Sequence, residues 1–292
     1  QHFSYASNRQ LVELIRTVST AGLESECRYL MGSCVSVLAS RAQSLGVREL
    51  VDVLQILQQV SLLHSMHSGT TSGGNGSRST LQDASGVLLD RLLELVTSPA
   101  GGNRWSEVRT RNVCRLFKGS LPKERAQKRE GEHQLAYDEA TQLQQPRIRE
   151  LLMSFLQFLM TPTNGIPSSA RTVDSLRMDD IAVLCRLCAS HRVPSEQALQ
   201  LLAHAAPRVK ENVIFLRPSD LSDLIFAYAS IGYRNVEWFI AVGQRAGDIG
   251  EQLREDDVAQ ILHAFQLIGV EHQMLRNSLE SSLRMRQLRR RA

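Results

Sequence analysis

The last third of the chain carries one nine-residue pattern three times. The pattern reads Leu176-Arg177-Met178-Asp179-Asp180-Ile181-Ala182-Val183-Leu184, and it returns over 216–224 and 253–261, at offsets of 40 and 37 residues. A fixed period of this length is typical of stacked helical units, because one unit cannot bury its apolar face without a neighbour. The repeat therefore predicts binding along an extended surface rather than chemistry in a pocket.

The apolar spacing inside each copy predicts a helix. Ile181, Leu184, Cys185 and Cys188 fall at i, i+3, i+4 and i+7, which lines one face of an α-helix. The equivalent residues of the other two copies are Leu221, Leu224, Ile225, Tyr228 and Val258, Ile261, Leu262, Phe265. These twelve positions are the predicted core of the repeats.

Polar residues and glycines indicate where these helices begin and end. Asp179, Ser219 and Asp256 stand just before the apolar stripes, where a side-chain oxygen can accept from free backbone N–H groups. Gly232 and Gly269 follow the second and third stripes and tolerate the left-handed conformation that ends a helix. A second helix is expected after each turn, over 195–210, 236–247 and 271–288.

The N-terminal half repeats this pattern more faintly. The whole chain is expected to be all-α, an α-solenoid of about six helix-turn-helix repeats of 37–40 residues. We expect N-terminal repeats over 1–64, a flexible Gly/Ser-rich insert over 65–83 and a further repeat region over 84–117. A charged insert over 118–147, helical or disordered, then precedes a helix and linker over 148–175 and three well-defined repeats with a basic tail over 176–292. In the first two helix pairs, the second helices are expected over 24–41 and 85–97. A third pair is expected to consist of a first helix over 105–117 and a second helix over 148–160.

The segment from Leu216 to Tyr233 resembles the repeat of octotricopeptide and heptatricopeptide proteins, and of the helical region in Fas-activated serine/threonine kinase-like proteins. Those families begin a repeat with an aromatic residue or Leu followed by Ser-Pro-Gln-Asp-Leu, continue with an apolar helix and close with Leu-Gly; here the start is Leu216-Arg217-Pro218-Ser219-Asp220-Leu221 and the close is Ile231-Gly232. The resemblance covers 176–288 and, more weakly, 8–60. The resemblance implies a mitochondrial matrix protein that binds mitochondrial RNA, either rRNA or mRNA, and protein subunits of a large ribonucleoprotein. The chain departs from the family where Phe226 or His263 replaces a frequent Trp, and no C-terminal RAP domain is recognisable.

The positive charge of the chain is concentrated at its C-terminal end. The formal net charge is +4, and five arginines after residue 283, at 284, 286 and 289–291, contribute +5 with no acid among them. The rest of the chain therefore sums to −1, and bulk charge gives no general attraction to phosphate. Thirty of the 34 basic residues are Arg, which suits phosphate and base contacts, although the codon bias of a GC-rich genome would give the same excess.

Two groups of arginines are candidate RNA contacts. Arg177, Arg217 and Arg254 each follow the leading Leu of a repeat and are expected to form a ladder with a spacing of about 10 Å, the distance between packed helices. The alternative is that they pair with Asp180, Asp220 and Asp257 on a solvated rim. The second group is the tail, with the alternative of an ordinary basic end; its members are Arg284, Arg286, Arg289, Arg290 and Arg291.

No catalytic, metal or cofactor site is expected. Cys185 and Cys188 have the spacing of redox and zinc sites, but a second ligand pair is missing and both occupy predicted core positions. No glycine-rich nucleotide loop and no catalytic triad is recognisable. No apolar run reaches the ~18 to 20 residues of a membrane span, and 151–160 is interpreted as a buried helix.

The sequence thus favours a non-enzymatic component of a mitochondrial ribonucleoprotein. The candidates are a mitoribosome or its assembly complex, and an RNA processing or editing complex, with no membrane and no small-molecule substrate. The alternative is a pure protein–protein scaffold without direct RNA contact. The chain begins at Gln1 rather than Met, as expected of a processed or trimmed protein, and removal of a mitochondrial presequence would give such a start.

Overall fold

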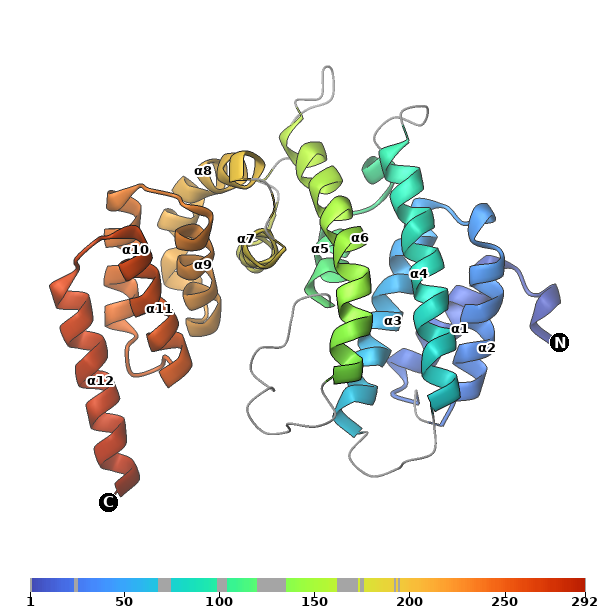
Figure 1. Cartoon of the computed structure of the whole chain (residues 1–292), viewed down its shortest axis with the longest axis horizontal. Coiled ribbons are helices and arrows are strands. Elements are labelled where there is room, and N and C mark those ends of the chain that lie inside the picture. Colours follow the sequence, from blue (N-terminus) through green and yellow to red (C-terminus); the bar gives the residue numbers. More distant parts are fainter. Residues whose placement is uncertain are drawn as a thin grey trace. The chain divides into compact units, whose positions relative to one another are not determined.

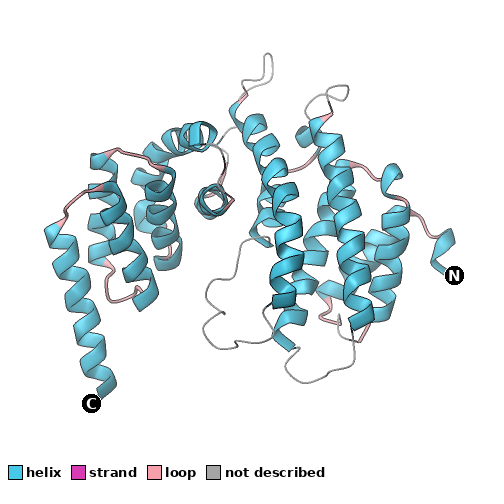
Figure 2. Ribbon diagram, viewed as in Figure 1, coloured by secondary structure: helices cyan, strands magenta, loops and turns pink. Residues whose placement is uncertain are grey.

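The computed structural model is all-helical over the residues that it describes. These are 2–23, 26–67, 75–98, 104–119, 135–161, 173, 176–191, 193 and 195–291, and none of them lies in a β-strand (Figure 2). The chain divides into two compact units, Gln1–Phe158 and Leu159–Ala292. The prediction of an all-α fold is therefore confirmed.

Among the described residues of the first unit are six α-helices, labelled in Figure 1. They are α1 (Asn8–Thr20), α2 (Arg28–Ser40), α3 (Val47–His67), α4 (Asn75–Thr97), α5 (Thr110–Gly119) and α6 (Leu135–Met160). Helix α3 packs against α1, α4 and α5, and α2 packs against α1 and α4. Phe155 of α6 is fully buried between Trp105 and Phe117, with ring centroids 5.3 and 5.8 Å away.

The second unit contains the three strong repeats. Its helices are α7 (Met178–Ser190), α8 (Ser195–Asn212), α9 (Pro218–Ile231), α10 (Val236–Asp248), α11 (Glu255–Ile268) and α12 (Gln273–Arg291). Helix α9 packs against both α7 and α11, while α10 packs against both α8 and α12. The first helices of successive repeats thus adjoin one another, and so do the second helices (Figure 1).

The core of the second unit lies along the predicted apolar stripes. Leu221, Leu224, Ile225 and Tyr228 are 0% exposed, and Cys185 and Cys188 are equally buried at their equivalent positions. Leu262 is the exception, because it is half-buried on α11 rather than enclosed. The left-handed glycines were placed correctly: Gly232 (φ 90°) and Gly269 (φ 69°) end α9 and α11.

The predicted helix starts were wrong by two residues. The residues at the N-caps of α7, α9 and α11 are Arg177, Arg217 and Arg254, so Asp179, Ser219 and Asp256 lie within the first turn. The physical reason is visible in α11, where the Asp257 carboxylate accepts from the backbone N–H of Arg254 (3.1 Å). The third helical residue therefore satisfies the helix start from inside the helix.

Three other boundaries also differ from the prediction. Helix α4 begins at Asn75 rather than Ser85, and Ala84, just before the predicted start, is buried. Helix α6 begins at Leu135, within the predicted charged insert. Residues 135–145 are rich in Ala, Gln, Glu and Leu, which are good helix formers. The expected helix over 105–117 is divided into a 3₁₀ turn, η3 (Arg104–Glu107), and α5. The remaining parts of the two inserts, 68–74 and 120–134, lie outside the described residues.

Candidate binding surface

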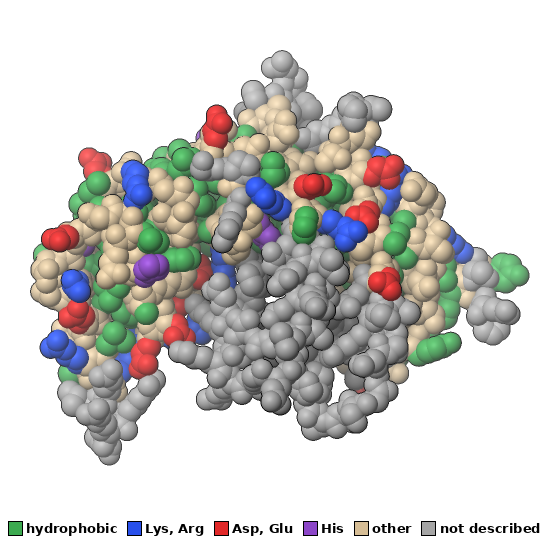
Figure 3. All heavy atoms as spheres, viewed as in Figure 1, with side chains coloured by type: hydrophobic (Ala, Val, Ile, Leu, Met, Phe, Trp, Pro, Cys, Tyr) green, Lys and Arg blue, Asp and Glu red, His purple; other side chains and the backbone are tan. Residues whose placement is uncertain are grey.

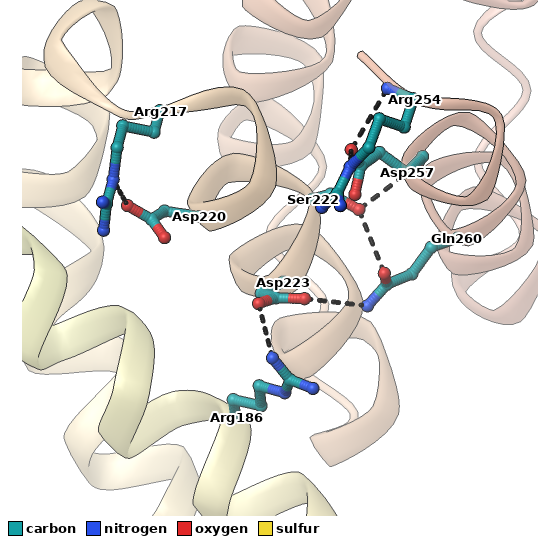
Figure 4. Close-up of polar contacts among 8 residues, drawn as sticks. All are labelled: Arg186, Arg217, Asp220, Ser222, Asp223, Arg254, Asp257 and Gln260. Atoms are coloured by element: carbon teal, nitrogen blue, oxygen red, sulfur yellow. Dashed lines mark hydrogen bonds and ion pairs between the residues drawn. The ribbon is translucent and has the colours of Figure 1, made fainter. Parts of the chain in front are cut away.

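Two of the three leading arginines form ion pairs within their own repeat. Arg217 Nε lies 2.7 Å from Asp220 Oδ2, and Arg254 Nε lies 3.1 Å from Asp257 Oδ2 (Figure 4). Both arginine side chains stay largely exposed, at 65% and 58%, whereas the Asp257 side chain is only 1% exposed. At these two repeats the structure has the ion pairs of the alternative interpretation, in which each leading Arg pairs with the Asp three residues after it rather than staying available for RNA.

Additional acids surround these ion pairs. The hydrogen bond to Asp220, and then the charges of Asp220 and Asp179, raise the pKa of Arg217, so the neighbouring repeat also contributes negative charge. Glu255 and Asp256 lie in the first turn of α11 beside Asp257. Arg177 occupies the same N-cap position on α7, three residues before the buried Asp180. The helix starts therefore carry more acid than base.

The charge of the second unit is divided along its sequence. Residues 176–283 contain ten Lys and Arg against fourteen Asp and Glu, whereas 284–291 contain five Arg and no acid. On the face drawn in Figure 3, the described Lys and Arg side chains are interspersed with Asp and Glu. That face shows no continuous basic surface among the residues described.

The exposed sides of α7, α9 and α11 present equivalent residues at four successive positions, which we call the first-helix face. Its members are Asp179, Val183, Arg186 and Ser190 on α7; Ser219, Asp223, Phe226 and Ser230 on α9; and Asp256, Gln260, His263 and Leu267 on α11. The spacing of i, i+4, i+7 and i+11 keeps each set on one side of its helix. None of these twelve residues is fully buried.

A polar chain connects the three helices across this face. Arg186 Nη1 lies 2.9 Å from Asp223 Oδ2, and the other carboxylate oxygen of Asp223 accepts from the Gln260 amide at 3.4 Å (Figure 4). The buried Ser222 hydroxyl donates to the Asp257 carbonyl at 3.2 Å. Burial raises the pKa of Asp223, and this effect exceeds the lowering by Arg186 and Gln260.

An aromatic pair lies beside the polar chain. The rings of Phe226 and His263 have centroids 6.1 Å apart and an angle of 29° between their planes. Phe226 is half-buried and His263 is exposed. The first-helix face thus carries a ring pair as well as the polar chain.

A second recurring feature was missed by sequence reasoning, namely an arginine that joins each second helix to the segment before its first helix. In the second unit, Arg208 donates to the Val173 carbonyl (3.1 Å), Arg245 to Ile214 (3.2 Å) and Arg286 to Gly250. We call these contacts arginine clasps. They occur in the first unit too, from Arg41 to Ala6 and from Arg91 to Gln43.

The clasps change the interpretation of the arginine excess. Arg208, Arg245 and Arg286 are spaced by 37 and 41 residues, close to the repeat period, and this spacing was the available signal. Arg286 belongs to the predicted RNA-binding set, yet its guanidinium is engaged by the protein itself. Arg284 is exposed on α12, and the side chains of Arg289, Arg290 and Arg291 lie outside the described ones.

The Cys185–Cys188 pair belongs to the core. Both thiols are buried, and burial raises the pKa of Cys185 strongly and that of Cys188 to about 12. No group of three or more His, Cys, Asp or Glu side chains suitable for a metal ion occurs among the described residues.

No family model matches this sequence, and no curated protein matches it either. Within the described part of the chain, no helix combines the length and the apolar character needed to cross a membrane.

Proposed function

We propose that this chain is an α-solenoid of six helical pairs that serves as a non-catalytic component of a mitochondrial ribonucleoprotein in the matrix. The recurrent arginine clasp supports the solenoid. In five helix pairs the same contact joins the second helix to the segment that precedes the first helix. These pairs are α1–α2, α3–α4, α7–α8, α9–α10 and α11–α12. A repeated contact of this kind is expected when each pair is one copy of the same unit. The family resemblance supports the mitochondrial and ribonucleoprotein assignments.

Within this function, the tail of α12 is the proposed RNA contact. The observation that carries this assignment is the separation of charge, since the five arginines after residue 283 follow a segment with an excess of acids. Arg284 is exposed and therefore accessible to phosphate, whereas Arg217 and Arg254 already have carboxylate partners. The helical surface would then contact protein neighbours, such as subunits of a mitoribosome, its assembly complex or an RNA-processing complex.

A pure protein scaffold is the second candidate, and the ion pairs at the leading arginines favour it. Each pair places a carboxylate beside a guanidinium on the edge that the ladder hypothesis requires, and this carboxylate repels phosphate. If the tail also has no affinity for RNA, the segment before it gives phosphate no general attraction, since residues 176–283 contain ten Lys and Arg against fourteen Asp and Glu.

Fluorescence anisotropy with a labelled single-stranded RNA separates the two candidates, because only the first requires direct RNA binding. A strand of about 20 nucleotides is long enough for the basic end of α12 to cover only part of it. The tail variant is Arg284→Gln/Arg289→Gln/Arg290→Gln/Arg291→Gln, which leaves the Arg286 clasp in place. The matched ladder variant is Arg177→Gln/Arg217→Gln/Arg254→Gln. We expect the tail variant to lose affinity at least tenfold with a shallower salt slope, and the ladder variant to change less than threefold. Absence of binding by the unmodified chain at low salt would leave the scaffold function.

A further inference from the structure

The first helices of the first unit, α1, α3 and α5, carry an excess of positive charge. Residues 8–20, 47–67 and 104–119, which cover these helices and the turn before α5, contain eight Lys and Arg against four Asp and Glu. The corresponding segments of the second unit, 177–190, 217–231 and 254–268, contain four against seven. The two units therefore differ in the sign of the charge on their first helices.

Six of these cations lie on the exposed side of the three helices, which we call the α1–α3–α5 face. The residues between its members, such as Ile15, Leu54 and Phe117, are buried. The spacing of i, i+4 and i+7 keeps each set of members on one side of its helix. These members, none of which is fully buried, are Arg9, Glu13 and Arg16 on α1; Arg48, Asp52 and Gln55 on α3; and Arg111, Arg115 and Lys118 on α5.

Two contacts join the three helices across this face. Arg16 Nη2 on α1 lies 2.8 Å from Asp52 Oδ2 on α3, and the Gln55 side-chain amide on α3 donates to the Asn112 carbonyl on α5. Helix α3 also packs against both α1 and α5. Because packed helices lie about 8–10 Å apart, the face extends over about 16–20 Å from α1 to α5.

The acids of α1 and α3 already have partners. Glu13 and Asp52 both pair with Arg16, at 2.8 Å in each case. Glu49 accepts from the backbone N–H of Gly46 at 3.1 Å, which satisfies a donor before the start of α3. These contacts use Arg16 and leave Arg9 and Arg48 without a neutralising carboxylate among the described residues.

The start of α5 lacks the acid that pairs with the leading arginine of α9. Arg109 directly precedes α5, but Asn112 stands where α9 has Asp220, and the first turn of α5 contains no acid. Glu107, in the turn before α5, pairs with Arg104 at 2.7 Å. Five cations of the face thus have no ion pair with any described residue, namely Arg9, Arg48, Arg111, Arg115 and Lys118.

The composition of the face identifies the kind of ligand that fits it. Its nine members are six cations, two acids and one amide. Protein interfaces are typically centred on apolar and aromatic side chains, and single nucleic-acid strands are typically held by stacking their bases on exposed rings. Arginine and lysine instead contact phosphate oxygens. The face is therefore suited to a ligand that presents its phosphate backbone.

From this surface we infer that the α1–α3–α5 face binds the phosphate backbone of base-paired RNA. Double-stranded RNA is recognised mostly by its shape and by contacts to its phosphates and 2′-hydroxyls. A duplex presents two backbones, which suits cations that are spread over three helices rather than along one line. The inference rests on the proposed function for the choice of RNA over DNA, and it adds a second contact to that of the α12 tail.

Fluorescence anisotropy of the full chain with a labelled RNA duplex of about 20 base pairs tests this inference, since duplex-binding domains cover about 16 base pairs. The face variant is Arg48→Gln/Arg111→Gln/Arg115→Gln/Lys118→Gln. Its affinity should fall about tenfold or more at low salt. Its salt dependence should also be shallower, because each lost phosphate contact lowers the slope of log K against log salt concentration by about one.

A matched control removes three Arg and one Lys from exposed positions outside the face. This control is Arg149→Gln/Arg177→Gln/Lys210→Gln/Arg276→Gln, and its affinity for the duplex should change less than about threefold. Circular dichroism checks that both variants keep their helical content. A face variant that binds the duplex as tightly as this control would overturn the inference.

Replacing Glu13 with Gln gives a change that loss of folding cannot imitate. The substitution removes a negative charge from the face and leaves Arg16 paired with Asp52. Binding of the duplex should therefore become tighter by about two- to threefold at low salt, because phosphate is no longer repelled at this position. Unchanged or weaker binding by Glu13→Gln would count against the face as the phosphate contact.

Two competing ligands distinguish the base-paired RNA from other polyanions. A single-stranded RNA of the same length and polyglutamate, a model of an acidic protein segment, should each displace the duplex only at a concentration about tenfold higher or more. Displacement by either ligand at the same concentration as unlabelled duplex would overturn the assignment to base-paired RNA.

The tail variant Arg284→Gln/Arg289→Gln/Arg290→Gln/Arg291→Gln separates this inference from the proposed function. Retention of duplex binding by the tail variant, with loss in the face variant, supports the inference even if the tail does not bind single strands. Loss of duplex binding in the tail variant alone would overturn the inference and leave the proposed RNA contact of the tail in place.

Discussion

Arg245 on α10 donates from Nη2 to the main-chain carbonyl of Ile214, 31 residues earlier, at a distance of 3.2 Å. Ile214 lies in the 3₁₀ turn η6 (Val213–Phe215) that leads into α9, so this contact connects the second helix of the repeat with the entry to its first helix. The carbonyls of such connecting segments have no helical partner, and a charged donor satisfies one of them.

Replacing Arg245 with Met should lower the free energy of unfolding by about 1.5–3 kcal/mol, the range for a hydrogen bond from a charged donor. Met keeps much of the apolar stem, so the loss reports on the guanidinium rather than on packing. Arg276→Met is the matched control on α12, where the exposed Arg276 is paired with Glu280 at 3.1 Å, and it should cost less than about 1 kcal/mol. Urea unfolding followed by circular dichroism measures both; equal losses would contradict the importance of the clasp.

The clasps also show where sequence reasoning reached its limit. The repeated apolar spacing predicted the first helices and their enclosed residues, such as Leu224 and Cys188, because burial depends on side-chain type and periodicity. A clasp ends on a backbone carbonyl, which any residue supplies, so Ile214 and Gly250 share nothing that a sequence pattern can detect. The pairing of Arg217 with Asp220 was one of two stated alternatives, since three-residue spacing permits the contact without requiring it.

Leu224 and Leu262 were assigned to the same core stripe, but their burial differs. Leu224 is 0% exposed on α9, so Leu224→Ala should cost about 2–5 kcal/mol through lost burial and a residual cavity. Leu262 on α11 is half-buried, and Leu262→Ala should cost roughly half as much or less because water already reaches part of the side chain. Urea unfolding of both variants provides the comparison, and equal costs would show that the register of α11 differs from the one described.

Two glycines of α10 should respond in opposite ways to alanine. A Cβ at Gly243 would lie 2.7 Å from Cζ of Phe265, a buried rigid ring, and 3.2 Å from Leu275. Gly243→Ala should therefore destabilise the protein by about 1–3 kcal/mol through overpacking. A Cβ at Gly247 would meet its nearest neighbour, Ser278, only at 3.7 Å, so Gly247→Ala should be neutral or stabilising by up to about 1 kcal/mol. Thermal unfolding of the two variants tests the packing of α10 on α11 and α12, and destabilisation of similar size at both positions would contradict it.

Asp223 should make the protein less stable as pH rises. Burial raises its pKa above 3.8 in the folded state, so the folded protein holds this proton more tightly than the unfolded chain does. The resulting contribution to stability is present below about pH 3.8 and is lost as pH rises through the higher folded-state pKa. Asp223→Asn cannot ionise, and its free energy of unfolding relative to the unmodified protein should increase over this window and then level off. Urea unfolding at several pH values from about 3.5 to 7 measures the difference; a difference that is constant with pH would contradict the raised pKa.

Cys185 and Cys188 should be unreactive in the folded protein. Burial raises the pKa of Cys188 to about 12, so at pH 8 almost none of this thiol is ionised, and the thiolate is the reactive form. The pKa of Cys185 is raised in the same direction, first by burial and then by the neighbouring Cys188. Cys27 is half-exposed and provides the internal control for access. Iodoacetamide labelling at pH 8 followed by peptide mass spectrometry should modify Cys27 well before the buried pair, and unfolding in urea should make both buried thiols reactive. Rapid labelling of Cys188 in the native protein would instead place this pair at an accessible site and reopen a redox or metal-binding role for it.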